Sequence, residues 1–176
     1  MNGDTRAASP PGFAEFVSAR YTTLVRYGTL LTGDQGRGED LVQDALIKTY
    51  RAWRRLHPGG APEAYTQRVM ARAAWRAARR LWRNEVATDE VPDVAAFDPY
   101  ESRDTAALVI AALRTLPAQQ RVVLVLRYWG GLTEREIADQ LNCSVGTVKS
   151  RVGRAMATLR RPGSPLAEEF TLSSSS

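Results

Sequence analysis

The sequence predicts an all-α protein made of two small helical domains that a flexible acidic linker joins. Apolar residues recur at spacings of three and four along most of the chain, and no segment of useful length alternates as a strand does. Charge is also divided along the chain. Residues 1–83 hold 14 basic and 7 acidic side chains, residues 84–104 hold 1 and 7, and residues 105–176 hold 9 and 5. An ordinary solvated surface rarely separates charge in this way, so we expect two basic domains with an acidic segment between them.

The first domain is predicted over residues 13–83, after a polar segment, residues 1–12, that is expected to be disordered. Its first helix should end near Gly33, because glycine readily takes the left-handed backbone found after a helix. A second helix is expected from about residue 39 to 56. A third is expected from about residue 62 to 82, with a proline in its first turn, where no backbone N–H is needed.

The acidic linker is predicted over residues 84–102, which include two prolines, and the second domain over residues 103–161. One helix is expected from residue 103 to 115, and Pro117 should begin another. A Trp-Gly-Gly turn then separates this helix from the last pair. Residues 162–176, which end in four serines, are predicted to form a mobile tail.

The last pair is predicted to be two short helices joined by a tight turn within residues 132–161. Thr133 and Glu136 have the spacing of a capping box, in which each side chain satisfies a free backbone N–H at the helix start. Asn142 tolerates the left-handed backbone that ends a helix, and Ser144 is a favourable N-cap for the next one. This is the form of a helix-turn-helix, whose second helix enters the DNA major groove.

The second of these helices has an apolar and a basic face. Its apolar residues recur at helical spacing and should face the core: Val145, Val148, Val152, Met156 and Leu159. Its other face is predicted to contact DNA through small, polar and basic residues: Gly146, Thr147, Lys149, Ser150, Arg151, Gly153 and Arg154. A helical hairpin with a merely solvated basic face is the alternative. The caps, the turn and the basic face together favour DNA binding.

The third helix of the first domain carries a stripe of arginines at spacings of three and four: Arg68, Arg72, Arg76, Arg79, Arg80 and Arg83. We expect these side chains to contact the DNA backbone, although plain solvation would also explain them. Aromatic residues lie among them, as in proteins that bind unpaired bases. For Trp82 and Val69 we expect burial in the core.

The second helix begins acidic, with Asp40, Gln43 and Asp44 on its outer face, and ends basic. This polarity suits the helix dipole without any partner. It also suits docking on a basic protein surface, and composition alone leaves both explanations open.

Several classes of function are disfavoured by the composition. The chain has a single cysteine, Cys143, and a single histidine, His57, which disfavours a disulfide framework, a zinc cluster or a histidine-based triad. Asp40 and Asp44 lie one turn apart and could hold a metal ion as in a nuclease, but further ligands are lacking. We therefore expect no catalytic residue, metal or cofactor. With no long apolar segment and no signal peptide, a cytoplasmic protein without membrane insertion is expected.

The net charge of +5 and the pI of about 9.8 favour a polyanionic partner. A stand-alone regulator that binds an operator as a dimer would use the same helix-turn-helix. Such a regulator would not account for the arginine-rich helix or for the acidic linker.

Three segments carry a resemblance to the extracytoplasmic-function (ECF) group of the bacterial sigma-70 family: EDLVQDALIKTYRAW at 39–53, LRTLPAQQRVVLVLRYWGGLTEREIA at 113–138 and CSVGTVKSRVGRAMATLRR at 143–161. The resemblance covers about residues 13–161 and implies a region 2-like domain followed by a region 4-like domain. It implies a non-enzymatic subunit that binds core RNA polymerase, directs it to promoters and helps to open the duplex. An anti-sigma factor is a common further partner in this group.

The resemblance also implies roles for particular residues. Asp40, Gln43 and Asp44 would dock on the clamp helices of the β′ subunit. The arginine-rich helix would bind and melt the −10 element, holding single-stranded DNA. The C-terminal domain would sit on the β flap and bind the duplex at the −35 element. There, Thr147 and Arg151 are candidates for contact with the DNA backbone. Four further residues match the base-reading positions of the family: Lys149, Ser150, Gly153 and Arg154.

Overall fold

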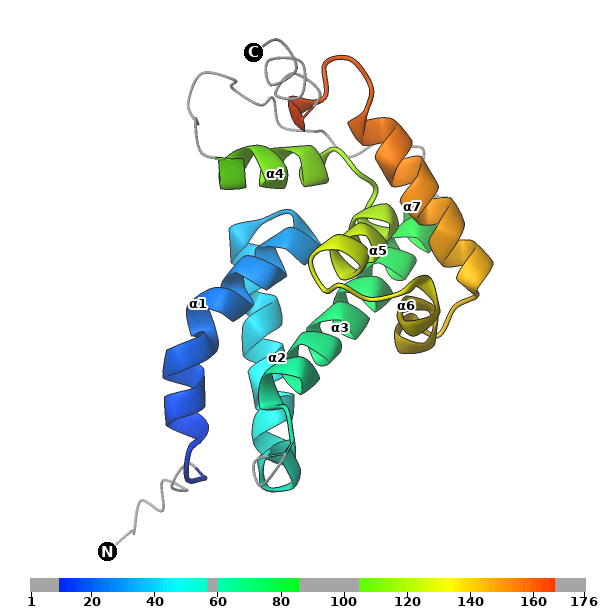
Figure 1. The fold of residues 1–176 in the computed structure, drawn as a ribbon. Helices are drawn as coiled ribbons and strands as arrows, with labels where there is room; N and C mark the ends of the chain where they lie inside the picture. The colour runs from blue at the N-terminus through cyan, green and yellow to red at the C-terminus, as the bar shows by residue number, and fades with distance from the viewer. Residues whose placement is uncertain (1–9, 57–59, 86–104, 167–176) are drawn as a thin grey trace, which may run out of the picture.

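The computed structural model describes residues 10–56, 60–85 and 105–166, and every regular element within these ranges is a helix. The helices are α1 (Phe13–Thr32), α2 (Gln35–Leu56), α3 (Pro62–Glu85), α4 (Thr105–Arg114), α5 (Ala118–Tyr128), α6 (Glu134–Leu141) and α7 (Val145–Leu159). We call α1–α3 the N-terminal bundle and α4–α7 the C-terminal bundle (Figure 1). The all-α prediction is confirmed. Most of the predicted disordered N-terminus (1–12), linker (84–102) and tail (162–176) lies outside the described residues. Two described parts differ from the prediction: α3 continues to Glu85, and Leu166 of the expected tail packs against the core.

The N-terminal bundle begins with two helices that cross at glycines. A Cβ atom on Gly38 would lie 2.6 Å from the backbone nitrogen of Thr29, and one on Gly28 would lie 2.6 Å from the carbonyl oxygen of Gly38. Contacts this short do not occur, so only glycine permits α1 and α2 to approach so closely. Gly28 lies inside the first helix as predicted, whereas Gly38 lies in the short segment between Gly33 and residue 39 that was expected to be a loop. Instead α2 begins at Gln35, because Asp34 accepts the Arg37 backbone N–H at 2.8 Å and so starts the helix early.

The core of the N-terminal bundle is apolar, with one buried polar pair. Leu24, Val42 and Met70 are fully buried. The hydroxyls of Thr49 and Thr66 lie 2.8 Å apart between α2 and α3, and each also lies within hydrogen-bond distance of a carbonyl of its own helix, so this buried pair is satisfied. The end of α1 is set by Gly33, whose φ of 76° is the expected left-handed C-cap and whose N–H donates to the Thr29 carbonyl at 2.7 Å.

The C-terminal bundle is arranged around α5. Pro117 is the N-cap of this helix, as its sequence predicts, and buried apolar residues run from Val122 to Leu126. The predicted Trp-Gly-Gly turn follows, with Gly131 at a φ of 64°. Helices α6 and α7 then form the predicted helix-turn-helix, in which α7 packs on α5 and α6.

The two bundles also pack on each other. Helix α5 contacts both α1 and α3, and α6 contacts α3, so that α5 lies where the bundles meet (Figure 1). Buried residues of both bundles belong to one continuous hydrophobic cluster. Within the described ranges, no helix is long and apolar enough to cross a membrane.

Candidate nucleic-acid interface

Local hydrogen bonds set the starts of α6 and α7 in the helix-turn-helix. Thr133 and Glu136 form the predicted capping box: the Thr133 N–H donates to Glu136 Oε2 at 2.8 Å, and the Glu136 N–H donates to Thr133 Oγ1 at 3.2 Å. The Thr133 hydroxyl, at 2.7 Å from Glu136 Oε2, and the Thr133 backbone N–H both donate to this carboxylate, and they hold the pKa of the Glu136 carboxyl below its usual value. Asn142 takes the predicted left-handed backbone at a φ of 53°, and Ser144 Oγ accepts the Thr147 N–H at 3.0 Å. The start of each helix is therefore set by its own cap, as predicted.

The outer face of α7 is open, as predicted. Lys149, Ser150, Gly153 and Arg154 are exposed, and Thr147 is half-buried. A Cβ atom on Gly153 would meet no other described atom within 4 Å, so this position offers a flat approach. Lys149 Nζ lies 3.9 Å from a Glu134 carboxylate oxygen, a loose surface pair that a phosphate can replace. The opposite face is apolar as expected, with Val148 and Leu159 buried.

Arg151 differs from Lys149 and Arg154, the other charged residues of this set, which are exposed. It is half-buried, it donates a hydrogen bond to Gln119 Oε1, and its Cζ atom lies 5.4 Å from the centre of the Trp75 ring. Burial lowers the pKa of its guanidinium. Arg151 therefore points toward α3 in this arrangement, a contact between segments far apart in sequence that periodicity could not indicate.

The arginine stripe of α3 is fully on the surface. Its six side chains are exposed: Arg68, Arg72, Arg76, Arg79, Arg80 and Arg83. Four of them, with Ala73, line a shallow hollow of about 420 Å³: Arg76, Arg79, Arg80 and Arg83. A concave surface that bears cations and no carboxylate favours a polyanion such as DNA.

The two tryptophans of α3 differ in burial, and the prediction for Trp82 was wrong. Trp75 is 3% exposed, whereas Trp82 is 59% exposed. At a spacing of seven residues they share a helix face, but Trp82 lies about 10 Å further along the axis. The cover that buries Trp75 therefore does not extend to Trp82. Val69 is half-buried and packs against the core, close to its predicted place.

The acidic face of α2 is exposed at Asp40, Gln43 and Asp44. The structure adds an apolar residue to this face. Ile47, one helical turn after Asp44, is 53% exposed. An exposed isoleucine beside carboxylates is more typical of a docking surface than of plain solvation. Sequence reasoning missed Ile47, although its position seven residues after Asp40 was a usable signal. Within residues 10–56, 60–85 and 105–166, no group of three or more His, Cys, Asp or Glu residues could hold a metal ion.

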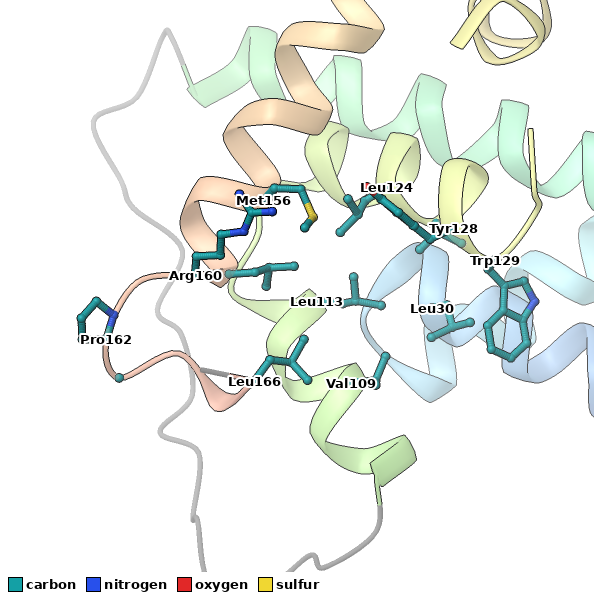
Figure 2. A pocket seen from close by; sticks show the side chains of 13 residues that line it. Leu30, Val109, Leu113, Leu124, Tyr128, Trp129, Met156, Arg160, Pro162 and Leu166 are labelled. Carbon is teal, nitrogen blue, oxygen red and sulfur yellow. The ribbon is translucent and has the colours of Figure 1, made fainter. Parts of the chain in front are cut away.

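An apolar groove of about 960 Å³ lies on the C-terminal bundle and is bordered by Leu30 of α1. Figure 2 shows Leu113 of α4, Met156 of α7 and Leu166 pointing into this space from different segments. Tyr128 and Trp129 stand at its rim and are 65% and 58% exposed. A contiguous apolar surface of this size suits a protein partner, and sequence reasoning did not identify it.

Comparison with known proteins agrees with this geometry. The family Sigma-70 region 2 matches residues 16–84, and the family Sigma-70, region 4 matches residues 106–159. The chain is 39% identical over 150 residues to the RNA polymerase sigma-E factor of Streptomyces avermitilis, which covers 84% of this chain and 83% of that protein. It is 31% identical over 160 residues to the ECF RNA polymerase sigma factor SigE of Mycolicibacterium smegmatis, which covers 87% of this chain and 62% of that protein.

A solved structure gives the same result for the fold. The sigma factor RpoE of Bartonella quintana, determined in complex with the anti-sigma factor NepR, has a TM-score of 0.58 and 26% identity, covering 86% of this chain and 96% of that chain. The chain therefore belongs to the ECF group of the sigma-70 family, and it is a sigma factor that binds core RNA polymerase, directs it to promoters and takes part in transcription initiation.

Proposed function

We propose that the two bundles divide promoter binding between them, and that the outer face of α7 binds the −35 element in the major groove. The observation that carries this proposal is the open face of α7 on a helix whose start is capped. Arg154 and Lys149 offer donors to guanine edges or phosphates, and Gly153 allows the groove to approach the helix. Thr147 and Arg151 would contact the backbone.

The N-terminal bundle would bind the −10 element through α3. Its exposed arginines can neutralise phosphates, and the exposed ring of Trp82 can stack on an unpaired base. Duplex opening then needs no catalytic group in this chain, because trapped bases and neutralised phosphates favour the melted form. We infer that the chain is not an enzyme and that it acts with the polymerase in the cytoplasm.

Two surfaces are suited to core polymerase. The exposed face of Asp40, Gln43, Asp44 and Ile47 would dock on the β′ clamp helices, where carboxylates meet a basic surface around an apolar contact. The apolar groove of the C-terminal bundle would receive the β flap. Because the related RpoE was solved with an anti-sigma factor, we also propose that a protein of this class regulates this chain.

Transcription in vitro tests the assignment of the α7 face. With core polymerase and a promoter library, Arg154→Ala should weaken promoter binding by about 1–3 kcal/mol and relax discrimination at one −35 position. Arg26→Ala, which removes an exposed arginine of α1, is the control for the change in charge. Equal losses on specific and random DNA would contradict a base-reading role.

Assembly with polymerase tests the acidic face of α2. Asp40→Arg and Asp44→Arg should each abolish or strongly reduce holoenzyme formation in gel filtration, because they place cations against a basic partner. The control is Glu15→Arg, which makes the same charge change at an exposed site of α1. Normal holoenzyme formation by both aspartate variants would refute this docking face.

A further inference from the structure

The apolar groove of the C-terminal bundle lies where the described part of the chain ends. After α7 the chain turns back at Gly163, whose φ is 84°, and the Ser164 N–H donates to the Arg161 carbonyl at 3.0 Å. This turn places Leu166 in the wall of the groove, where it packs against the core (Figure 2). The residue that follows Leu166 therefore begins at the groove itself.

The groove is too large and too apolar to stay open at low cost. Its volume is about 960 Å³, and apolar side chains of α4, α5 and α7 point into it (Figure 2). Apolar surface in contact with water is unfavourable, and an open patch of this kind marks an interaction site. Ser164 Oγ, between the lining residues Gly163 and Leu166, is buried without a hydrogen-bond partner among the described residues. A segment laid alongside would supply it with a backbone carbonyl.

The sequence that continues from Leu166 carries apolar side chains suited to this groove. Residues 167–172 read AEEFTL, in which Phe170 and Leu172 are the large apolar residues. Phe170 lies four residues after Leu166, a span of about 13–14 Å at full extension. A side chain on so short a tether meets the groove at an effective concentration in the millimolar range. Two modest apolar anchors can therefore compete with partners that come from solution.

Charge favours the same occupant. Arg160 lines the groove and Arg161 follows it; both are exposed, and neither takes part in the two ion pairs found among the described residues. The next carboxylates along the chain are Glu168 and Glu169, which directly precede Phe170. A segment anchored in the groove by Phe170 carries these carboxylates past the two arginines. Exposed pairs of this kind orient a segment more than they stabilise it.

We propose that residues 167–172 occupy the groove, with Phe170 and Leu172 as apolar anchors and the two glutamates beside the arginines at the end of α7. The C-terminal segment is thus a cover for this surface in the free protein. The inference rests on the proposed function only where the β flap is concerned. Segment and flap then compete for one groove, and the flap must displace the segment during assembly with polymerase.

Binding of the neutral dye Nile red tests the cover without polymerase. If the segment occupies the groove in about 90% of the molecules, a chain ended after Leu166 should bind the dye about tenfold more tightly than the parent chain. The matched control is a chain ended after Leu172, which loses only the four serines and should bind the dye as the parent does. Equal dye binding by the parent and by the chain ended after Leu166 would overturn the inference.

A point variant of the full chain locates the anchor. Phe170→Ser should raise the affinity for Nile red by most of the same factor, because the larger of the two anchors is lost. Helical circular dichroism should stay that of the parent, since none of the described helices contains this residue. Thr171→Ser is the control at the neighbouring position. An affinity unchanged by Phe170→Ser would show that this ring does not cover the groove, against the proposal.

The dye also separates the segment from a second copy of this chain as the occupant. A groove covered by another copy opens on dilution, so the dye affinity of the parent would depend on protein concentration and gel filtration would show a dimer. That result would overturn the proposal. An affinity independent of concentration in a monomeric parent supports it.

Assembly with core polymerase tests the competition with the flap. The chain ended after Leu166 should bind core polymerase up to about tenfold more tightly than the parent, and the difference should vanish with a core polymerase that lacks the β flap. Higher dye binding with an equal affinity for core polymerase would support the cover and count against the proposed flap role alone. Tighter binding of core polymerase with unchanged dye binding would overturn the cover.

Discussion

The two helices assigned to DNA, α3 and α7, acquire their surfaces in different ways. Helix α7 begins at a capped turn whose bonds are all local, and its outer face is the one that periodicity predicts. Helix α3 is covered by segments distant in sequence, and its face changes from buried at Trp75 to exposed at Trp82 within two turns. Local hydrogen bonding thus sets one DNA surface, and packing between distant segments sets the other.

This difference predicts where substitutions act on the fold and where they act on DNA. On α7 the buried core residues and the residues assigned to DNA lie on opposite faces, so a substitution can change folding or DNA recognition separately. On α3 the buried Trp75 and the exposed Trp82 lie on the same face, one after the other. The two tryptophans of this helix therefore offer the most direct way to separate the contributions.

The largest effect is expected for Trp75→Ala. This side chain is buried in the core and lies under Arg151 of α7, so its removal leaves a cavity as well as Arg151 without its ring. The free energy of unfolding should fall by about 3–5 kcal/mol in urea titrations. A loss below about 1 kcal/mol would mean that α3 is not covered at this position in solution.

A smaller effect of another kind is expected for Trp82→Ala. Because this ring is exposed, the stability should change by no more than about 0.5 kcal/mol. Holoenzyme affinity for a single-stranded −10 oligonucleotide, measured by fluorescence anisotropy, should fall by about 1–3 kcal/mol. Trp82→Phe keeps an aromatic face and should retain most of the affinity. Equal affinity of the alanine variant and the parent would remove Trp82 from the DNA surface.

The same contrast explains how far the sequence could be interpreted. The capping box, Asn142, Ser144 and the Gly33 helix end were predicted correctly, because each depends on a few neighbouring residues. The outer faces of α2 and α7 followed from helical periodicity. The family resemblance then supplied the roles that periodicity cannot assign.

The features that the sequence could not indicate all depend on contacts between distant segments. The crossing of α1 and α2 at Gly28 and Gly38 was not predicted, since only the partner helix explains why both must be glycine, and Gly38 was expected in a loop. The exposure of Trp82 depends on where the cover of α3 ends. The inward turn of Arg151 likewise depends on Trp75, 76 positions earlier in the chain.

A third test examines the local hydrogen bonds that start α6, the helix that precedes α7 in the helix-turn-helix. Thr133→Ala removes the oxygen that accepts the Glu136 N–H, so the stability should fall by about 1 kcal/mol in thermal unfolding. Thr22→Ala, at an exposed position within α1, is the control for loss of a threonine hydroxyl. If both variants lose the same stability, the capping box does not orient the helix-turn-helix.

The smallest effect is expected for the pH dependence of the stability that the Thr133–Glu136 capping box contributes. Hydrogen bonds from Thr133 lower the pKa of Glu136 in the folded state, so the ionised carboxylate stabilises the fold above its ordinary pKa. As the pH falls through the lowered pKa, the carboxylate takes up a proton and this contribution is lost. The difference in melting temperature between the parent chain and Glu136→Gln should therefore be present at neutral pH and narrow in acid. Asp139→Asn, which removes an exposed carboxylate from the same helix, is the matched control. If the difference in melting temperature between the parent chain and Glu136→Gln stays constant down to strongly acidic pH, the charge of this carboxylate does not contribute to the cap.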